Sequence, residues 1–537
     1  MGTGAAVALG GAAMAFRSGH LGKARTQIDP WTLNRGNKAE PDTLDPHLAQ
    51  ANWEMNIIGD MFSGLMTLDA AANPIFGAAE SYSVSEDGLT YRFKLRDHVW
   101  SDGVPVTADD YVFSFRRVLD PATASQYAPM LYPIQNAEAV NGRKMPIDQL
   151  GVRAIDNRTV EIAFHFQVPY IKELMAHMTT FAVPRHVVEK YGADWMNPAH
   201  AVSNGPFILK EWVPNEYVHL VKNPRFYAAD DVVLKNVFFY PTQDQSAALK
   251  RFRAGEFDVI SDGIPPQQID WLRENMSREL RLYPYILTQY VQFNMHRAPF
   301  DDPRVREAMC MAIDREIITA KIMRANEAPA YALVPPGMVG YPGKAQLGFK
   351  SMRMASRVEK AKQLLAEAGF GPSRPLSFDY NLQNTTESKI IAVALQEMWR
   401  EVGAQVRLMQ SESQVHYQTL RRRDFAAAWT GWVADYRDAK NYLFLFASST
   451  TDMNFGGYSN AEYDRLMTSS DNERDPAKRQ LLLQSAEQVL LADNVIAPVF
   501  FGVARDLVSQ QVKGWVSNNV NFNRSRYLSL ARGKATV

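Results

Sequence analysis

The sequence has little cysteine and no long apolar run. Its 537 residues include one cysteine, Cys310, which cannot form an internal disulfide or supply the thiolates of a structural metal site. Because no segment has 18 consecutive apolar residues, none is predicted to span a membrane. Cys310 lies between Met309 and Met311, and this setting predicts a small residue of a buried core.

The sequence also lacks an excess of charge of either sign. Lys plus Arg and Asp plus Glu each number 58, so the formal net charge is zero. The longest basic run is the three arginines at 421–423. Nucleic acid binding needs concentrated positive charge, so we expect no nucleic acid partner.

Motifs of common enzymes are missing as well. There is no G-x-S-x-G, no H-E-x-x-H and, apart from a Gly-Gly pair near the N-terminus, no glycine-rich phosphate loop. The ten histidines are not spaced as metal ligands. Paired acids such as those at 109–110 and 301–302 lie where helices are predicted to start, and the helix dipole explains them. We therefore predict no catalytic residue, no metal and no cofactor, and a binding protein instead of an enzyme.

The N-terminal segment is typical of an exported protein. Residues 1–15 carry no charged side chain and end in Ala13-Met14-Ala15, the A-x-A signature of signal-peptidase cleavage. We expect residues 1–29 to be a signal-like segment and spacer, truncated at its N-terminus because a basic region is missing. No cysteine for lipid attachment is present near it. The expected location is therefore the periplasm, with the protein free and not lipid-anchored.

Length and periodicity predict more than one folding unit, because 537 residues are too many for a single hydrophobic core. Thr107 is predicted to cap a helix that ends at Leu119, and residues 207–220 predict a hairpin. A parallel β-α-β unit is predicted from strand 376–380, helix 388–402 and strand 405–409. Further helices are predicted at 55–67, from 303 to about 323, and from a capping box at 356–359.

Three motifs give the chain a family resemblance. W-S-D-G-x-P-V-T-A-x-D occupies residues 100–110, E-P-x-x-L-D-P-H occupies 40–47, and G-W-x-A-D-Y occupies 431–436 after an apolar run at 425–429. These motifs resemble those of the periplasmic oligopeptide-binding proteins, the family 5 solute receptors of peptide ABC transporters, which include murein-peptide-binding relatives. The resemblance implies an α/β fold of the type II periplasmic-binding-protein kind. Two lobes would meet at a hinge, with the larger lobe divided into two subdomains.

The resemblance also implies how the chain is divided. An extra subdomain of lobe I would span 63–186, and lobe II would span 286–503. The core of lobe I would be assembled from 30–62, 187–285 and 504–531. Lobe I is therefore expected to be discontinuous in sequence, with a strand that starts near Tyr285 crossing the hinge.

The same resemblance implies a peptide site. In the family, the Asp of G-W-x-A-D-Y receives the ligand's α-ammonium group, and this residue is Asp435 here. Taken alone, an Asp after a strand is usually a cap, a turn former or a solvated charge. Gln50 stands where the family has an acidic side chain, so Asp435 would carry the charge alone. Positions implied to contact the peptide backbone or line its pockets are Gln50, Ala51, Asn52, Tyr127, Tyr285, Tyr290, Trp429, Gly431, Trp432, Val433 and Ala434.

The chain departs from the family where a ligand carboxylate would be held. Broad oligopeptide receptors have arginines two and about eleven residues before the Gly-Trp pair, and these positions are Trp429 and Leu420 here. The neighbouring Arg421 is a candidate carboxylate ligand, because a guanidinium group can bind a carboxylate bidentately. The alternative is that residues 421–423 form a solvated loop.

The implied function is capture of an extended oligopeptide between two closing lobes, followed by delivery to the permease subunits of an ABC transporter. We expect the receptor to be a monomer. Receptors of the same fold for murein peptides, a sugar or a metal chelate remain as alternatives, and an enzyme is less expected.

Overall fold

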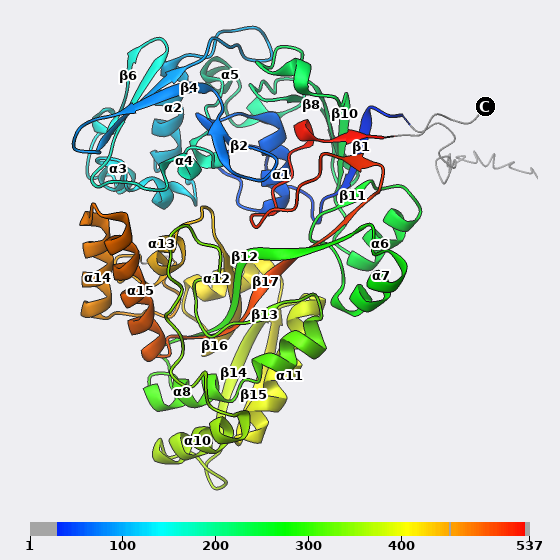
Figure 1. Cartoon of the computed structure of the whole chain (residues 1–537). Coiled ribbons are helices and arrows are strands. Elements are labelled where there is room, and N and C mark those ends of the chain that lie inside the picture. Colours follow the sequence, from blue (N-terminus) through cyan, green and yellow to red (C-terminus); the bar gives the residue numbers. More distant parts are fainter. Residues whose placement is uncertain (1–28, 451–452, 532–537) are drawn as a thin grey trace, which may run out of the picture.

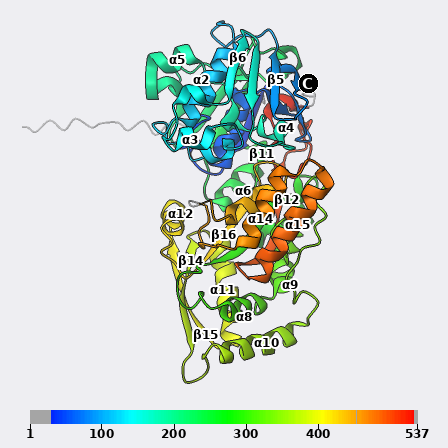
Figure 2. The same cartoon turned by 90° about the vertical axis from the view of Figure 1, so that its left-hand side faces the viewer.

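The computed structural model describes residues 29–450 and 453–531, so the predicted signal-like segment lies outside the described residues except for Asp29. Two lobes are stacked along the long axis of the molecule, as Figures 1 and 2 show. In the described part of the chain, one sheet of eleven strands runs through both lobes in the order β15-β14-β16-β12-β17-β11-β1-β10-β9-β8, with β13 beside β17. The α/β fold with two lobes is therefore confirmed.

Lobe I is built on a hydrophobic cluster that includes Leu33, Trp100 and Val237. In its part of the large sheet, strand β1 pairs in parallel with β10 and with β11. The strands of this part are β1 (Thr32–Gly36), β8 (Phe207–Val213), β9 (Tyr217–Lys222), β10 (Asn236–Tyr240) and β11 (Val259–Ile260). The helices close to these strands in the sequence are α1 (Asn52–Met61), α5 (Arg185–Tyr191), α6 (Gln245–Arg253) and α7 (Ile269–Asn275).

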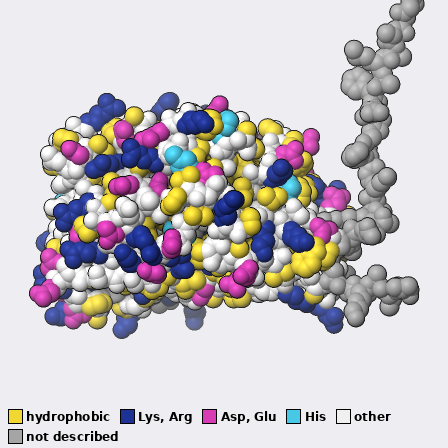
Figure 3. All heavy atoms as spheres, turned by 90° about the horizontal axis from the view of Figure 1, so that it is seen from above, with side chains coloured by type: hydrophobic (Ala, Val, Ile, Leu, Met, Phe, Trp, Pro, Cys, Tyr) yellow, Lys and Arg dark blue, Asp and Glu magenta, His cyan; other side chains and the backbone are white. Residues whose placement is uncertain are grey.

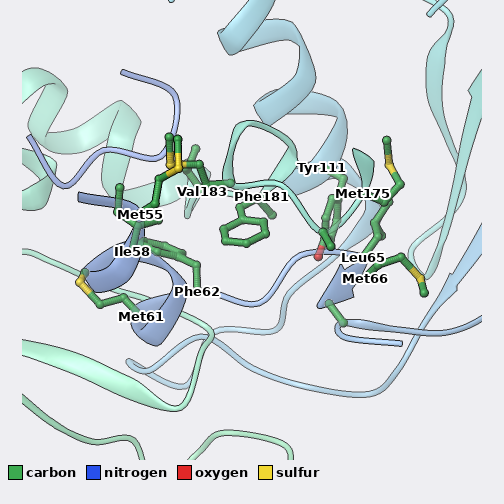
Figure 4. Packing of buried hydrophobic residues seen from close by; sticks show 14 of the residues in the cluster. Met55, Ile58, Met61, Phe62, Leu65, Met66, Tyr111, Met175, Phe181 and Val183 are labelled. Carbon is green, nitrogen blue, oxygen red and sulfur yellow. The ribbon is translucent and has the colours of Figure 1, made fainter. Parts of the chain in front are cut away.

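A second, antiparallel sheet of lobe I has the order β4-β5-β7-β6. Helix α2 (Ala108–Leu119) has the predicted bounds, because Asp110 accepts hydrogen bonds from the backbone N–H and the hydroxyl of Thr107. Figure 4 shows how Met55, Ile58 and Phe62 lie beside Phe181 in the shared core. The strands are β4 (Ala79–Val84), β5 (Thr90–Leu95), β6 (Val152–Asp156) and β7 (Thr159–Ala163). Smaller elements of lobe I are β2 (Met66–Leu68), β3 (Pro74–Phe76), α3 (Ala137–Asn141), α4 (Ile171–Leu174), β18 (Val512–Lys513) and β19 (Ser529–Leu530).

Two long antiparallel strands, β12 (Leu280–Phe293) and β17 (Ile496–Val508), cross between the lobes (Figure 1). At the lobe I end β17 pairs with β11, and at the lobe II end β12 pairs with β16 (Ala427–Val433). The hinge strand predicted to start near Tyr285 is therefore part of β12. These two strands form the hinge, because they carry the main chain and the sheet from one lobe into the other.

Lobe II is an α/β unit with two hydrophobic clusters, one around Trp399 and one around Tyr442. The predicted parallel β-α-β unit is confirmed as β14 (Leu376–Gln383), α11 (Thr386–Glu401) and β15 (Ala404–Ser411). Cys310 is completely buried in the first of these clusters. The other elements are α8 (Pro303–Met311), α9 (Arg315–Ile317), β13 (Ala328–Pro329), α10 (Met354–Glu367), α12 (Ser413–Arg421), α13 (Lys440–Leu443), α14 (Ala461–Asn472) and α15 (Pro476–Ala492).

Three predicted helices have other bounds. The helix predicted at 55–67 is α1, which ends at Met61, because the following apolar residues are buried in an extended segment. The helix that begins at Pro303 ends at Met311, and Asp314 caps a separate helix there. The capping box predicted at 356–359 is wrong, because α10 already begins at Met354. The residue ranges predicted for the lobes and the extra subdomain stay predictions.

The surface agrees with the balanced composition. Figure 3 shows basic and acidic side chains intermixed on the face seen from above. Within residues 29–450 and 453–531, no helix is both long and apolar enough to cross a bilayer.

Candidate functional site

A cavity of about 1100 Å³ lies between the lobes and against the hinge strands. Small-molecule sites in proteins commonly occupy about 300–1,000 Å³, so this cavity is large enough for a ligand of several residues. Lobe I contributes residues such as Lys38 and Asn52, and the hinge contributes Tyr285 and Arg505. Lobe II contributes the start of α11, the start of α12 and strand β16. The site therefore depends on both lobes being held together.

Strand β16 forms part of the cavity wall. Trp429, Gly431 and Val433 line it as alternate residues of the strand, and Thr430 borders it as well. A Cβ at Gly431 would lie 2.9 Å from the backbone oxygen of Thr288 on β12, so glycine suits this close approach of the neighbouring strand. Three of the predicted contact residues on lobe II thus lie on the wall of the cavity.

Asn52 and Tyr285 form the wall on the other side of the ligand space. The Asn52 side-chain amide donates to the Tyr285 hydroxyl at 3.0 Å, which ties lobe I to hinge strand β12. Both residues also border a smaller cavity that shares part of this lining.

Other predicted contact residues do not line the cavity. Gln50 is exposed, and the backbone N–H groups of Gln50 and Ala51 donate to Glu54 at the start of α1. Trp432, Ala434 and Tyr290 lie in or against the hydrophobic cluster around Tyr442. Trp432 and Ala434 alternate with residues 429, 431 and 433, and Tyr290 on β12 is paired with Thr430, so these three are absent from the cavity lining. 

Asp435 follows β16 at the junction of the lobes, two residues beyond the cavity wall at Val433. Its side chain is only 9% exposed. The hydroxyl of Tyr127, from lobe I, donates to its carboxylate at 3.3 Å, and the Asn441 amide donates at 3.4 Å. Among the described residues no Lys or Arg lies within 4.0 Å of it, and the nearest histidine nitrogen, on His177, is 3.9 Å away.

The environment of Asp435 opposes its charge. Burial raises its pKa to about 7, and the hydrogen bonds from Asn441 and Tyr127 only partly offset this effect. Burial and the charge of Arg524 lower the pKa of His177 to about 3, so this imidazole is neutral and supplies no positive charge. Asp435 is thus a nearly buried carboxylate that lacks a cation within the described protein.

The two residues after Asp435 also contact lobe I. The Tyr436 ring stacks on Tyr170 with a centroid separation of 4.2 Å and an angle of 5° between the planes. Arg437 lies 3.7 Å from the carboxylate of Glu173. Asp435 is therefore held in a segment that joins the lobes.

Arg421 is exposed at the C-terminal end of α12 and is not part of the cavity wall. Tyr417, one helical turn earlier, does line the cavity, whereas Leu420 is fully buried. The arrangement favours the alternative in which residues 421–423 are solvated.

Sequence reasoning missed the charged groups of the cavity wall. Lys38 pairs with Asp262 at 2.6 Å, and Arg505 pairs with Glu387 at 2.5 Å. Arg505 interrupts an otherwise mostly apolar strand, and a charge in such a run is a signal that could have identified it. The charged residues of the wall are Lys38, Asp244, Asp262, Glu327, Glu387, Glu412 and Arg505. Among residues 29–450 and 453–531 no group of His, Cys, Asp or Glu is arranged to hold a metal ion.

Comparisons with known proteins agree with this architecture. The family model described as "Bacterial extracellular solute-binding proteins, family 5 Middle" matches residues 73–454. The periplasmic oligopeptide-binding protein OppA of Salmonella typhimurium is 36% identical over 496 residues, which cover 91% of each chain. The probable deoxycholate-binding periplasmic protein YgiS of Escherichia coli is 34% identical and covers 92% of this chain and 93% of its own.

A structural comparison also bears on the lobe arrangement. The Escherichia coli murein tripeptide binding protein MppA superimposes with a TM-score of 0.88 at 31% identity, covering 94% of this chain and 99% of that one. Its unliganded open form gives a TM-score of only 0.74 over 94% and 98% of the two chains. The lobes of the present structure are therefore arranged differently from that open form. With the family model and these relatives spanning most of its length, the chain belongs to the bacterial extracellular solute-binding proteins of family 5.

Proposed function

We propose that the protein is a periplasmic receptor that closes its lobes around an extended oligopeptide and delivers it to the permease of a peptide ABC transporter. The observation that carries this proposal is the state of Asp435, a carboxylate withdrawn from water with no described cation beside it. The α-ammonium group of a peptide supplies the missing charge, and pairing would remove much of the cost of burying the carboxylate. The relative OppA carries the name of an oligopeptide binder, which agrees with this reading.

Strand β16 supplies the peptide with a backbone to pair with. On one side it pairs with β12 along its whole length, from Ala427 to Val433. On the other side its pairing with β14 ends at Ala428. The edge from Trp429 to Val433 therefore faces the cavity, and an extended peptide with its N-terminus near Asp435 could add a strand there.

Closure follows from the position of the site. In this proposal lobe I comprises residues 30–62, 187–285 and 504–531 with the subdomain 63–186, and lobe II comprises 286–503. Rotation about β12 and β17 brings Tyr127 to Asp435 and buries the peptide, and the closed pair of lobes is what the permease recognises. The receptor acts as a monomer and without a catalytic step or cofactor, as expected from relatives that are binding proteins.

An anionic ligand such as deoxycholate fits the cavity poorly. The described wall carries five carboxylates and two cations, and both cations are already paired. A ligand carboxylate would meet like charges there.

Thermal unfolding with added ligands tests the proposal. Free-amino peptides of two to six residues should raise the melting temperature as mass action requires, and N-acetylated peptides of the same sequence should raise it much less. A peptide set that never changes the melting temperature, while a sugar, a metal chelate or deoxycholate does, would overturn the proposal.

A further inference from the structure

One wall of the cavity concentrates three charged groups from distant parts of the chain. Arg505 lies on hinge strand β17, Glu387 in the first turn of α11, and Glu327 just before β13. All three line the cavity. We call Glu327, Glu387 and Arg505 the acidic wall, because two carboxylates there flank one guanidinium group.

Arg505 is held firmly but incompletely satisfied. It is 7% exposed, and its Nη2 donates to the Glu387 carboxylate at 2.5 Å. Its Nε and Nη1 are buried and have no hydrogen-bond partner in the described protein. A buried donor without an acceptor is destabilising, so Arg505 has hydrogen-bonding capacity that the described protein does not use.

Glu327 is the carboxylate of the acidic wall that does not form the ion pair with Arg505. It is 7% exposed, and its carboxylate accepts a hydrogen bond from the backbone N–H of Ala325. Burial raises the pKa of Glu327, Arg505 opposes this rise, and the nearby charge of Glu387 adds to it. The wall thus has a surplus of negative charge in a site shielded from water.

No unpaired Lys or Arg elsewhere in the described lining balances the negative charge of the acidic wall. Lys38, the other basic residue of the described lining, is already paired with Asp262 at 2.6 Å. Trp429 occupies a lining position where an arginine would have offered a positive charge, and Arg421 is outside the wall. The cavity therefore offers its ligand donors at Arg505 and acceptors at the two glutamates.

We propose that the acidic wall is a specificity subsite for a basic residue of the bound peptide. The ammonium or guanidinium group of that residue lies between Glu327 and Glu387, and a main-chain carbonyl of the peptide accepts from Arg505. The pairing balances two carboxylates with two cations and satisfies the free donors. This inference rests on the proposed peptide-receptor function and adds a preferred side-chain chemistry to it.

Matched pentapeptides test the subsite. Pentaalanine is compared by isothermal titration calorimetry with versions that carry one Lys, norleucine or Glu at each of positions two to five. At one position, Lys should bind about tenfold or more tightly than norleucine, as expected for one added charge pair of about 1.4 kcal/mol, and Glu should bind most weakly. Equal affinities for the Lys, norleucine and Glu peptides at every position would overturn the inference. If pentaalanine still binds in that case, the proposed function stands. Failure of the protein to bind any of these peptides would overturn the proposed function itself.

Two variants locate the effect. Glu327→Gln should reduce the Lys-to-norleucine ratio to within about twofold, since roughly one charge pair is removed. Glu387→Gln should go further and favour the Glu peptide over the Lys peptide, because Arg505 loses its internal partner and becomes free for a ligand carboxylate. Glu401→Gln, an exposed position on the same helix α11, is the control and should leave the ratios unchanged. If Glu387→Gln does not fold, Glu327→Gln alone decides, and an unchanged ratio in that variant contradicts the subsite.

Discussion

Asp435 and Asp438 lie three residues apart, and both side chains are nearly buried, at 9% and 7% exposure. Asp438 receives both terminal nitrogens of Arg479, at 2.7 and 3.0 Å. Asp435 receives only neutral donors from Tyr127 and Asn441.

The difference separates a structural carboxylate from a candidate ligand group. A buried charge is tolerated when it is paired and hydrogen-bonded, and Asp438 meets this condition inside lobe II. Asp435 does not meet it within the described protein, and it lies where the lobes meet beside the cavity. The contrast is what the proposed role of Asp435 in ligand recognition rests on, and the following changes would sharpen or break it.

The largest effect on stability is expected for Asp438→Asn. The change leaves the Arg479 guanidinium buried without its counter-charge, and breaking such a pair costs about 3–5 kcal/mol. Urea unfolding of the ligand-free protein measures this loss. The affinity ratio between free-amino and N-acetylated peptides should not change, and a ratio that collapses in this variant would contradict the assigned division of roles.

Asp435→Asn should weaken peptide binding without destabilising the ligand-free protein near pH 7. Affinity for free-amino peptides should fall by about 2–5 kcal/mol, because the buried ammonium loses its charged partner. N-acetylated peptides should bind the parent and the variant equally. Calorimetric titration of both peptide types measures the contrast, and an unchanged affinity for free-amino peptides would remove Asp435 from the site.

The pH dependence of stability should differ between the parent and Asp435→Asn. The pKa of Asp435 rises from 3.8 to about 7 on folding, so this group favours the folded state at low pH and this contribution is lost as the pH rises toward 7. At about 1.36 kcal/mol per pKa unit, charging it costs the folded protein up to about 4 kcal/mol.

The measurement is the unfolding free energy of both ligand-free proteins from pH 4 to 8, expressed as their difference. Subtraction removes other groups that titrate in this window, such as Glu487 and Asp506 with pKa values of about 7 and 6. The parent should lose stability relative to the variant as the pH rises. A difference that does not vary with pH would show that ligand-free protein in solution exposes Asp435 to water.

The smallest effect is expected for Arg421→Ala. An exposed side chain outside the cavity wall should change peptide affinity by less than about 0.5 kcal/mol. Peptides with free and amidated C-termini, two to six residues long, should be affected equally. A selective loss for the free carboxylate at one length would restore Arg421 as a carboxylate ligand.

Local signals were sufficient for much of the fold. The helix capped at Thr107, the hairpin of β8 and β9, and the β14-α11-β15 unit were predictable, because caps, turns and apolar periodicity act over a few residues. The end of α8 at Met311 was not predictable from periodicity, since the apolar pattern continues into α9 although the helix is interrupted. The start of α10 was predicted too late. The pattern at 356–359 has the residue types of a capping box, but the helix already begins at Met354.

The sequence by itself determined that the chain belongs to a two-lobed receptor family. It also determined that Asp435, in the G-W-x-A-D-Y motif, comes directly after a strand. Only the tertiary structure decided which charges are balanced. Arg479 reaches Asp438 across 41 residues of sequence, and Arg505 reaches Glu387 across 118. Ion pairing depends on distance and burial in space, so no local pattern reveals that Asp438 has a partner in lobe II while no Lys or Arg of the described residues lies within 4.0 Å of Asp435.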